Sequence, residues 1–167
     1  MSETWLVTGG AGFIGRAVVE ELLVEADGPE VVVLDALTYA AHPGALRRLG
    51  DAGRLHVVEG DVADADAVSS LVTSCLPGVI LHLASETHVD RAIRDVAPFV
   101  RTNVQGSWVV ANAALGVGAR LVQVSTDEVY GDRSGRDPAR EGDPVSPSNP
   151  YAATKACGDA MVQSLVR

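Results

Sequence analysis

Two acidic side chains, Asp127 and Glu128, stand next to each other directly after the apolar run 121–124. The run predicts a buried strand, so both acids should lie just past its carboxyl end, where open parallel sheets bind their ligands. Two adjacent carboxylates in a closed pocket cannot both ionise at low cost, so one can stay protonated and act as an acid. The alternative is a hydrophilic surface turn, the commonest setting for adjacent acids.

Tyr151 and Lys155 lie four residues apart. On a helix this spacing places both side chains on one face, one above the other. A phenol accepts a proton only as phenolate, so its ordinary pKa near 10 must fall by roughly three units for work at neutral pH. The ammonium group of Lys155 would stabilise the phenolate. The alternative is an interface aromatic beside a solvated lysine.

Short apolar runs that predict strands alternate with helical patterns along the chain. The runs are 5–8, 31–34, 55–58, 79–83 and 121–124. Strands and helices in this alternation predict right-handed βαβ units. We therefore expect one α/β domain over residues 1–167, a Rossmann-type doubly wound parallel sheet with strand order 3-2-1-4-5.

Several helices are predicted between these strands. A short helix should end near Gly50, and Asp64 could cap the next one. The apolar stripe of that helix consists of Val68, Leu71, Val72 and Cys75. A longer helix is predicted over 98–115, with one face made of Val100, Val104, Trp108, Ala111 and Leu115.

The first strand ends in Gly10-x-Gly12-x-x-Gly15, and Asp35 follows twenty residues later at the end of the second strand. Strand, glycine turn, helix and acid together form the dinucleotide-binding context, because small residues let the backbone approach a pyrophosphate. No arginine follows Asp35, which favours NAD over NADP. The alternative is a tight turn without a ligand. Asp61, after the third strand, could contact adenine or serve only as a turn residue.

Composition and charge exclude several classes of function. Thirteen basic and 22 acidic side chains give a net charge of -9, which disfavours nucleic acid and anionic membranes as partners. Cys75 and Cys157 form no CxxC pair and predict reduced thiols. The sequence shows no charged leader, no run of membrane-spanning length and no histidine cluster with metal spacing, so we expect a cytoplasmic protein without a metal.

The motifs Gly9-x-x-Gly12-x-x-Gly15 and Tyr151-x-x-x-Lys155 resemble those of the extended short-chain dehydrogenase/reductase superfamily. Within it, segments 82–91, 102–106 and above all 125–131 are similar to the nucleoside-diphospho-glucose 4,6-dehydratases, especially the dTDP-glucose family. Sugar 4-epimerases share the glycine turn and the Tyr-Lys pair but usually lack the adjacent acids.

The resemblance implies a lyase that holds NAD and removes water from a nucleotide-sugar. Its implied catalytic residues are Thr126, Asp127, Glu128, Tyr151 and Lys155. The implied cofactor-binding residues are Gly9, Gly12, Phe13, Ile14, Gly15, Asp35, Leu37, Thr38, Asp61, Val62, Leu83, Ala84, Ser85, Tyr151 and Lys155. The implied substrate contacts are Thr87, His88, Thr126, Asp127 and Glu128.

The resemblance also carries expectations about assembly. Family members continue into a nucleotide-sugar lobe, which we expect this chain to lack, so the missing C-terminal half is a possible partner. A homodimer is expected through the helices that carry Trp108 and Tyr151. A different hypothesis is an NAD-binding module that cannot turn over substrate.

Overall fold

The computed structural model describes residues 3–42, 44, 46, 53–135 and 137–165, and its centre is a parallel sheet in the order β3-β2-β1-β4-β5. The helix predicted to end near Gly50 lies outside the described residues. The strands are β1 (Thr4–Thr8), β2 (Glu30–Asp35), β3 (Leu55–Glu59), β4 (Val79–His82) and β5 (Arg120–Gln123). The predicted sheet and its strand order are confirmed.

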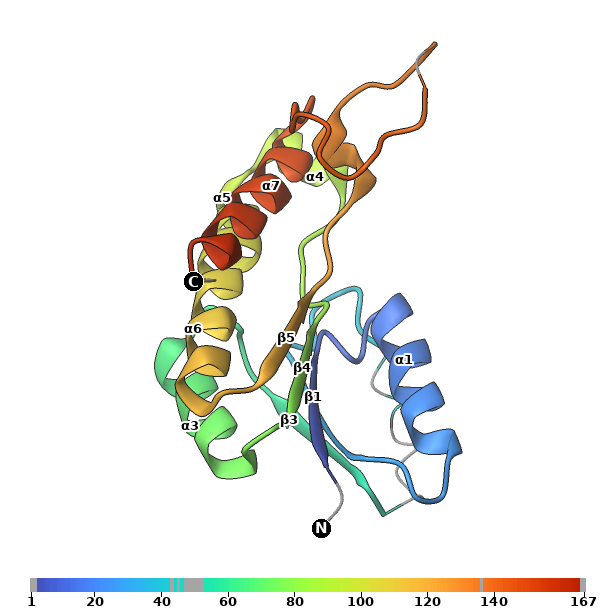
Figure 1. Cartoon of the computed structure of the whole chain (residues 1–167), viewed down its shortest axis with the longest axis vertical. Helices are drawn as coiled ribbons and strands as arrows, with labels where there is room; N and C mark the ends of the chain where they lie inside the picture. Colours follow the sequence, from blue (N-terminus) through green and yellow to red (C-terminus); the bar gives the residue numbers. More distant parts are fainter. Residues whose placement is uncertain (1–2, 43, 45, 47–52, 136, 166–167) are drawn as a thin grey trace.

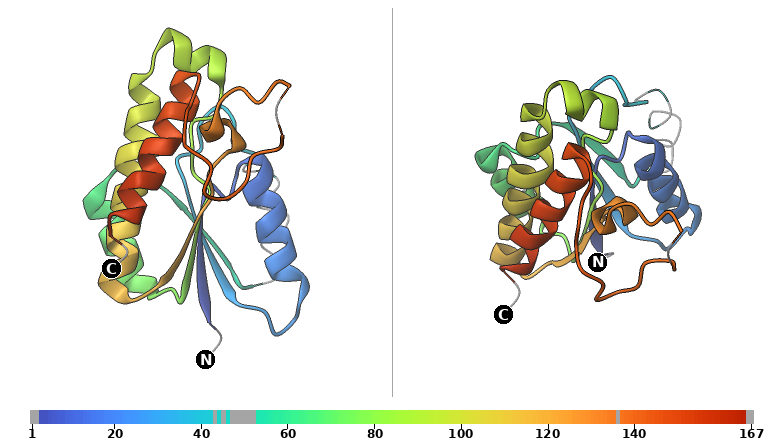
Figure 2. Two further views of the ribbon diagram at one scale, coloured as in Figure 1. Left: turned by 45° about the horizontal axis from the view of Figure 1, so that its top comes forward. Right: turned by 90° about the horizontal axis from the view of Figure 1, so that it is seen from above.

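Helices cover both faces of the sheet (Figure 1). One face carries α1 (Phe13–Val24), and the other carries α3 (Ala65–Cys75) and α6 (Ser107–Val117). The last helix, α7 (Pro150–Gln163), packs beside α6 on the same side, as both views in Figure 2 show. None of the helices in the described part of the chain is long and apolar enough to cross a membrane.

Alternate side chains of the central strands build two separate cores. In β1, Leu6 belongs to the cluster under α3 and α6, whereas Val7 belongs to the cluster under α1. In β2, Val32 and Val33 divide in the same way. This two-residue period follows from the pleat of a strand. With helices on both faces, most residues of the central strands are buried, so the carboxyl edge of the sheet is the place where a ligand can bind.

The strand predicted at 121–124 is present as β5, but the prediction that it is buried is wrong. β5 stands at one end of the strand order, and its residues alternate between exposed and half-buried. Leu121 packs against the core under α6, but 43% of the surface of Val122 is exposed. An apolar run indicates a β-strand, but it does not indicate whether neighbouring strands lie on both sides of that strand.

The helix predicted over 98–115 is divided. The chain passes from α5 (Ala97–Phe99) through η2 (Val100–Gly106), a π-helix, into α6. A π turn holds one more residue than an α turn, so the buried face moves relative to an α-helical pattern. Phe99 and Asn103 are buried, whereas Val100 and Leu115 of the predicted face are 47% and 61% exposed. The predicted stripe therefore largely faces outward.

The ends of α3 follow from local chemistry. The side chain of Asp64 accepts a hydrogen bond from the backbone N–H of Ala67 at 3.0 Å, which confirms the predicted cap. Val68 and Val72 are buried, as the stripe predicted. The helix ends at Leu76, which takes a left-handed conformation with φ 43° and donates its N–H to the carbonyl of Val72.

Two shorter helices complete the carboxyl edge. They are α4 (Val89–Arg94), in the connection after β4, and η3 (Asp127–Tyr130), a 3₁₀-helix in the connection after β5. Both connections leave the sheet at its carboxyl edge, so residues far apart in the sequence meet there.

Candidate active site

A cleft of about 570 Å³ runs along the carboxyl edge of the sheet. It is lined by the glycine turn, by the connections after β2, β3 and β4, and by α7. All predicted cofactor residues line it except Leu37. The backbone N–H of Leu37 donates a hydrogen bond to Asp35, and its side chain packs against the core under α1. The predicted cofactor-binding residues therefore meet in one cleft, and their contact with a cofactor stays a prediction.

The glycine turn fits closely against its surroundings. Gly9 has φ 71°, and a Cβ there would lie 2.6 Å from the backbone nitrogen of Ala84. A Cβ at Gly15 would lie 2.1 Å from the carbonyl oxygen of Gly9. Side chains are therefore excluded at both positions. The first turn of α1, with its unpaired N–H groups, is thereby brought to the wall of the cleft.

Asp35 fastens the end of β2 to the glycine turn. One carboxylate oxygen accepts from the N–H of Ala11 at 2.9 Å, and the other accepts from the N–H of Leu37 at 2.8 Å. A carboxylate oxygen can accept more than one hydrogen bond, so Asp35 can still bind a hydroxyl group in the cleft. The next residue in the wall is Ala36, which brings no positive charge to this end of the cleft.

Asp61 is a turn residue that also lines the cleft, and its contact with adenine stays a prediction. It lines the cleft, and its Oδ1 accepts from the N–H of Ala63 at 2.8 Å as a turn residue does. Its Oδ2 accepts from Arg101 Nε at 3.0 Å and Nη2 at 2.8 Å. The ion pair with Arg101 joins η2 to the connection after β3, a contact that the sequence did not indicate.

Tyr151 and Lys155 stand in the first turns of α7 and both line the cleft. Asn149 caps this helix, because its side chain accepts from the N–H of Ala152 at 2.8 Å, and Pro150 follows at the first helical position. Lys155 is 4% exposed and donates from Nζ to the carbonyl oxygen of Val124 at 2.6 Å. The ammonium group is thus tied to the end of β5.

Burial is the largest influence on the pKa of both members of the pair. Burial raises the pKa of Tyr151, a hydrogen bond with Thr126 opposes this rise, and the charges of Glu128 and Asp127 add to it. Burial lowers the pKa of Lys155, and the charge of Asp159 opposes that fall. In the chain itself burial disfavours the phenolate, and the expected lowering of the Tyr151 pKa by Lys155 together with a positive nicotinamide stays a prediction.

The acidic pair lies in η3, past the carboxyl end of β5, and does not line the cleft itself. Thr126 caps η3, since its Oγ1 accepts from the N–H of Glu128 at 3.3 Å. Asp127 is exposed, whereas Glu128 is half-buried and accepts from Asn149 Nδ2 at 2.6 Å. Because both acids act on the pKa of the Tyr151 phenol, they lie within its electrostatic reach.

Thr87 and His88, the other predicted substrate contacts, line the cleft near Tyr39. The hydroxyl of Tyr39 donates to Glu86 Oε2 at 3.1 Å, and the guanidinium of Arg91 lies 3.9 Å from the centre of the Tyr39 ring. These contacts join the connections after β2 and β4. No sequence pattern indicated Tyr39, because only the fold brings these segments together.

Asn103, in the π-helix, belongs to the family-like segment 102–106, but no role was predicted for it. It is 1% exposed, and its Oδ1 accepts from Ser85 Oγ and from the N–H of Glu86, both at 2.9 Å. Its Nδ2 donates to the carbonyl of Glu86 at 2.9 Å and to Thr154 Oγ1 at 3.0 Å. Asn103 therefore joins the wall of the cleft to the helix that carries Tyr151. A buried asparagine has no sequence pattern of its own.

His82, inside β4, has a structural role. It is 1% exposed, with Nδ1 2.6 Å from Thr8 Oγ1 and Nε2 3.3 Å from Ser107 Oγ. Burial, with a smaller effect of the charge of Lys155, lowers its pKa to about 3. Among the described residues, no group of three or more His, Cys, Asp or Glu side chains could hold a metal ion.

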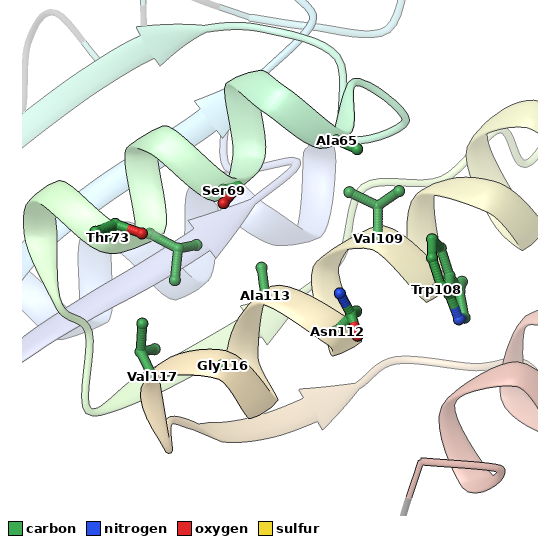
Figure 3. Close-up of a pocket in the computed structure, with 10 residues that line it drawn as sticks. Ala65, Ser69, Thr73, Trp108, Val109, Asn112, Ala113, Gly116 and Val117 are labelled. Atoms are coloured by element: carbon green, nitrogen blue, oxygen red, sulfur yellow. The ribbon is translucent and has the colours of Figure 1, made fainter.

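A second hollow, of about 270 Å³, lies between α3 and α6 (Figure 3). Figure 3 shows Thr73 and Ser69 of α3 across from Val109 and Ala113 of α6. No lining residue is titratable, and no predicted site residue belongs to it. The chemistry of the described chain is therefore concentrated in the cleft at the carboxyl edge of the sheet.

Comparison with known proteins shows relatives that cover nearly the whole chain. The chain is 46% identical over 164 residues to dTDP-glucose 4,6-dehydratase of Mycolicibacterium smegmatis, an alignment that covers 97% of this chain and 48% of the relative. It therefore spans about half the length of the curated relatives that it matches. The resemblance stated from the sequence motifs is confirmed.

Solved structures agree as well. DesIV, a dTDP-glucose 4,6-dehydratase from Streptomyces venezuelae with NAD and TYD bound, is 41% identical with a TM-score of 0.85, and the match covers 96% of this chain and 51% of that one. UDP-glucose 4-epimerase from Brucella ovis in complex with NAD is 29% identical with a TM-score of 0.85, over 98% of this chain and 47% of that one.

The family described as "NAD dependent epimerase/dehydratase family" matches residues 5–167, nearly the whole chain. The matched range includes the glycine turn, the acidic pair and the Tyr-Lys helix. The chain therefore belongs to the NAD dependent epimerase/dehydratase family.

Proposed function

We propose that this chain is the NAD-binding and catalytic part of a nucleotide-sugar 4,6-dehydratase, a hydro-lyase whose substrate is dTDP-glucose. The observation that carries the proposal is one arrangement of four residues. Tyr151 and Lys155 lie in the wall of a dinucleotide-type cleft, and Asp127 and Glu128 lie within electrostatic reach of the Tyr151 phenol. The proposed domain covers residues 1–167, and the lobe that grips the nucleotide belongs to a second half.

NAD fits the residues of the cleft. The glycine turn has no room for side chains, so a pyrophosphate can approach the first turn of α1. Asp35 keeps acceptor capacity for the adenosine ribose, and Ala36 offers no charge to a 2′-phosphate. Asp61 and Val62 would hold the adenine end. At the other end, segment 83–85 and the Tyr-Lys pair would hold the nicotinamide end.

Tyr151 would act as the base toward the 4-hydroxyl of the sugar. NAD, when bound, supplies a reversible acceptor for the hydride that leaves C4 and returns to C6. The positive nicotinamide and Lys155 would together offset the burial that raises the Tyr151 pKa. Thr126 already lowers this pKa through its hydrogen bond, so it would steady the phenolate oxygen during proton transfer.

The acidic pair would remove water from the 4-keto sugar. The ketone acidifies the proton at C5, which Glu128 would accept while Asp127 donates a proton to the departing 6-hydroxyl. As the hydride adds to C6, Glu128 would return a proton to C5, so that the net change is the loss of one water. Asn149 holds the Glu128 carboxylate at 2.6 Å, so this base is fixed relative to the helix that carries Tyr151. Thr87 and His88, in the wall of the cleft that Tyr151 lines, would contact the sugar.

Product analysis tests the proposal. The chain is incubated with NAD and dTDP-glucose, alone and together with a separately expressed C-terminal half of a relative. A 4-keto-6-deoxy product, lighter by one water, supports the dehydratase. Conversion to the 4-epimer would instead identify an epimerase, the activity named for one solved relative. If the chain binds NAD but neither mixture gives a product, the chain is a binding module and the dehydratase proposal is wrong.

We further propose that the chain forms a homodimer through η2, α6 and α7 and acts in the cytoplasm. The support for the dimer is the outward face of η2 and α6, where Val100, Trp108 and Leu115 are 47%, 39% and 61% exposed. Apolar side chains gathered on one face mark an interaction surface. The support for a reducing compartment is that both cysteines are free thiols.

A further inference from the structure

Asp159 lies on α7 one turn after Lys155, outside the set of residues that the sequence motifs single out. One of its carboxylate oxygens accepts a hydrogen bond from Ser125 Oγ. Within the described residues its other oxygen, Oδ1, is buried and has no hydrogen-bond partner. A buried carboxylate oxygen without a partner costs free energy, so its retention points to a use for the charge.

The same helix face is fastened twice to the end of β5. Lys155 donates to the carbonyl of Val124 at 2.6 Å, and Asp159 accepts from the next residue, Ser125. Two residues further along the chain begins η3, with Asp127 and Glu128. Whatever fixes Val124 and Ser125 against α7 therefore fixes both halves of the proposed catalytic group relative to each other.

We propose that Asp159 is a positioning residue that provides the negative charge for Lys155 and anchors Ser125, and so sets the acidic pair against the Tyr-Lys pair. This proposal rests on the proposed function, because it gives Asp159 the role of positioning the residues of that active site. Asp159 acts through Lys155 and Ser125 and takes no part in proton transfer.

The electrostatics of Lys155 agree in direction. Burial lowers the pKa of Lys155, and the charge of Asp159 opposes that effect. The other groups that face this region do not supply the same charge. His82 in β4 is held neutral by burial, with a pKa of about 3. Asp127 and Glu128 in η3 act on the phenol of Tyr151.

Two arginines on the helices packed against α7 are also engaged elsewhere. Arg91 of α4 lies over the ring of Tyr39, and Arg101 of η2 pairs with Asp61. Removal of the Asp159 charge should therefore lower the pKa of Lys155 further, since the effect of burial is then unopposed.

The sequence makes this measurement direct, because Lys155 is the only lysine among the 167 residues. Chain labelled with [ε-¹³C]lysine gives one NMR resonance, whose shift against pH reports the protonation of Lys155. We expect the midpoint in Asp159→Asn at lower pH than in the parent. Two variants are controls. Ser125→Ala keeps the carboxylate of Asp159, and Asp66→Asn removes the charge of an exposed side chain on α3. In both variants Lys155 should titrate at the same pH as in the parent.

An unchanged midpoint in Asp159→Asn overturns the proposal, and so does an equal shift in Ser125→Ala or Asp66→Asn. If the Asn variant does not fold, Asp159→Ser removes the same charge with a smaller side chain and must give the same shift. The titration needs neither NAD nor a sugar nucleotide. It therefore stands or fails separately from any test for turnover of dTDP-glucose.

Discussion

Tyr151 lines the cleft from the first turn of α7. The start of this helix is fixed, because Asn149 caps it and Pro150 is its first residue. Tyr151→Phe keeps the ring and removes the proton-transferring hydroxyl. We expect turnover of dTDP-glucose to fall by roughly 10² to 10⁴, the usual contribution of a positioned acid or base, while NAD affinity stays within a small factor. Calorimetric NAD binding and product formation should be measured on the same preparation.

The matched control for this variant is Tyr130→Phe, which removes a phenol hydroxyl from η3 without touching the cleft. It should turn over substrate like the parent. Equal losses in both variants would show that the loss in Tyr151→Phe comes from a general disturbance of this edge of the sheet. In that case Tyr151 would not be the proton acceptor.

His82 makes the stability of the fold depend on pH. Its pKa is about 3 in the folded chain and near 6.5 when unfolded, so the folded state binds fewer protons between these values. The contribution of His82 to the free energy of unfolding is therefore fully present above pH 6.5. It is lost as the pH falls toward 3, by about 1.4 kcal/mol per pH unit.

Urea unfolding at pH 7 and pH 5 tests this dependence. Between these two values the parent should lose about 2 kcal/mol more than His82→Gln, which has no imidazole to protonate. His56 is exposed on β3, so His56→Gln should lose stability as the parent does. A loss in His82→Gln as large as in the parent would rule out the buried imidazole as the cause.

At the scale of elements, the turn between β1 and α1 depends on the lack of side chains. In Gly15→Ala the new Cβ would lie 2.1 Å from the carbonyl oxygen of Gly9, so the turn must open. We expect the dissociation constant for NAD to rise by at least about tenfold, which corresponds to 1.4 kcal/mol. Calorimetry or fluorescence titration with NAD gives the value.

Gly116→Ala provides the control, because a Cβ at Gly116 in α6 meets no atom within 4 Å. This variant should bind NAD like the parent and gain up to about 1 kcal/mol in unfolding free energy, since alanine favours helices. If both variants bind NAD equally well, the glycine turn does not contact the cofactor.

The elements that the sequence predicted well are those whose signals are local. The second strand is an unbroken apolar run with Asp35 at its end, and the glycine turn has fixed spacing, so both were located correctly. The π-helix at Val100–Gly106 was missed, because a periodicity search assumes a constant number of residues per turn. The exposure of β5 was missed, because neighbouring strands are not encoded in the run itself.

The same division holds within the site. Tyr151, Lys155 and the acidic pair stand in short motifs that can be read from the sequence. Asn103, Tyr39 and Asp159 act through contacts with distant segments, such as the bond from Asn103 to Thr154 across 51 positions. Spatial proximity of this kind follows from the βαβ topology, and single-sequence patterns contain no record of it.

At the scale of the whole molecule, the outward face of η2 and α6 should decide the oligomeric state. Trp108 is 39% exposed and lies next to the hollow between α3 and α6. Trp108→Glu places a charge in the proposed interface, where burial would leave it without a partner. Sedimentation velocity should show a dimer for the parent and a monomer for this variant.

Val122→Glu is the control for the dimer, because it places the same charge on exposed β5, away from the proposed interface. It should sediment as the parent does. A monomeric parent at high protein concentration would contradict the homodimer. A dimer that survives Trp108→Glu would instead place the contact on another surface.

The single, buried lysine has a consequence for proteolysis. A protease that cleaves only after lysine has one bond to attack in this sequence, the bond from Lys155 to Ala156 inside α7. Lys155 is 4% exposed, so cleavage requires that α7 first opens. The rate of this one cut therefore reports the local opening of the Tyr-Lys helix, and ligands that close the cleft over it should slow the cut.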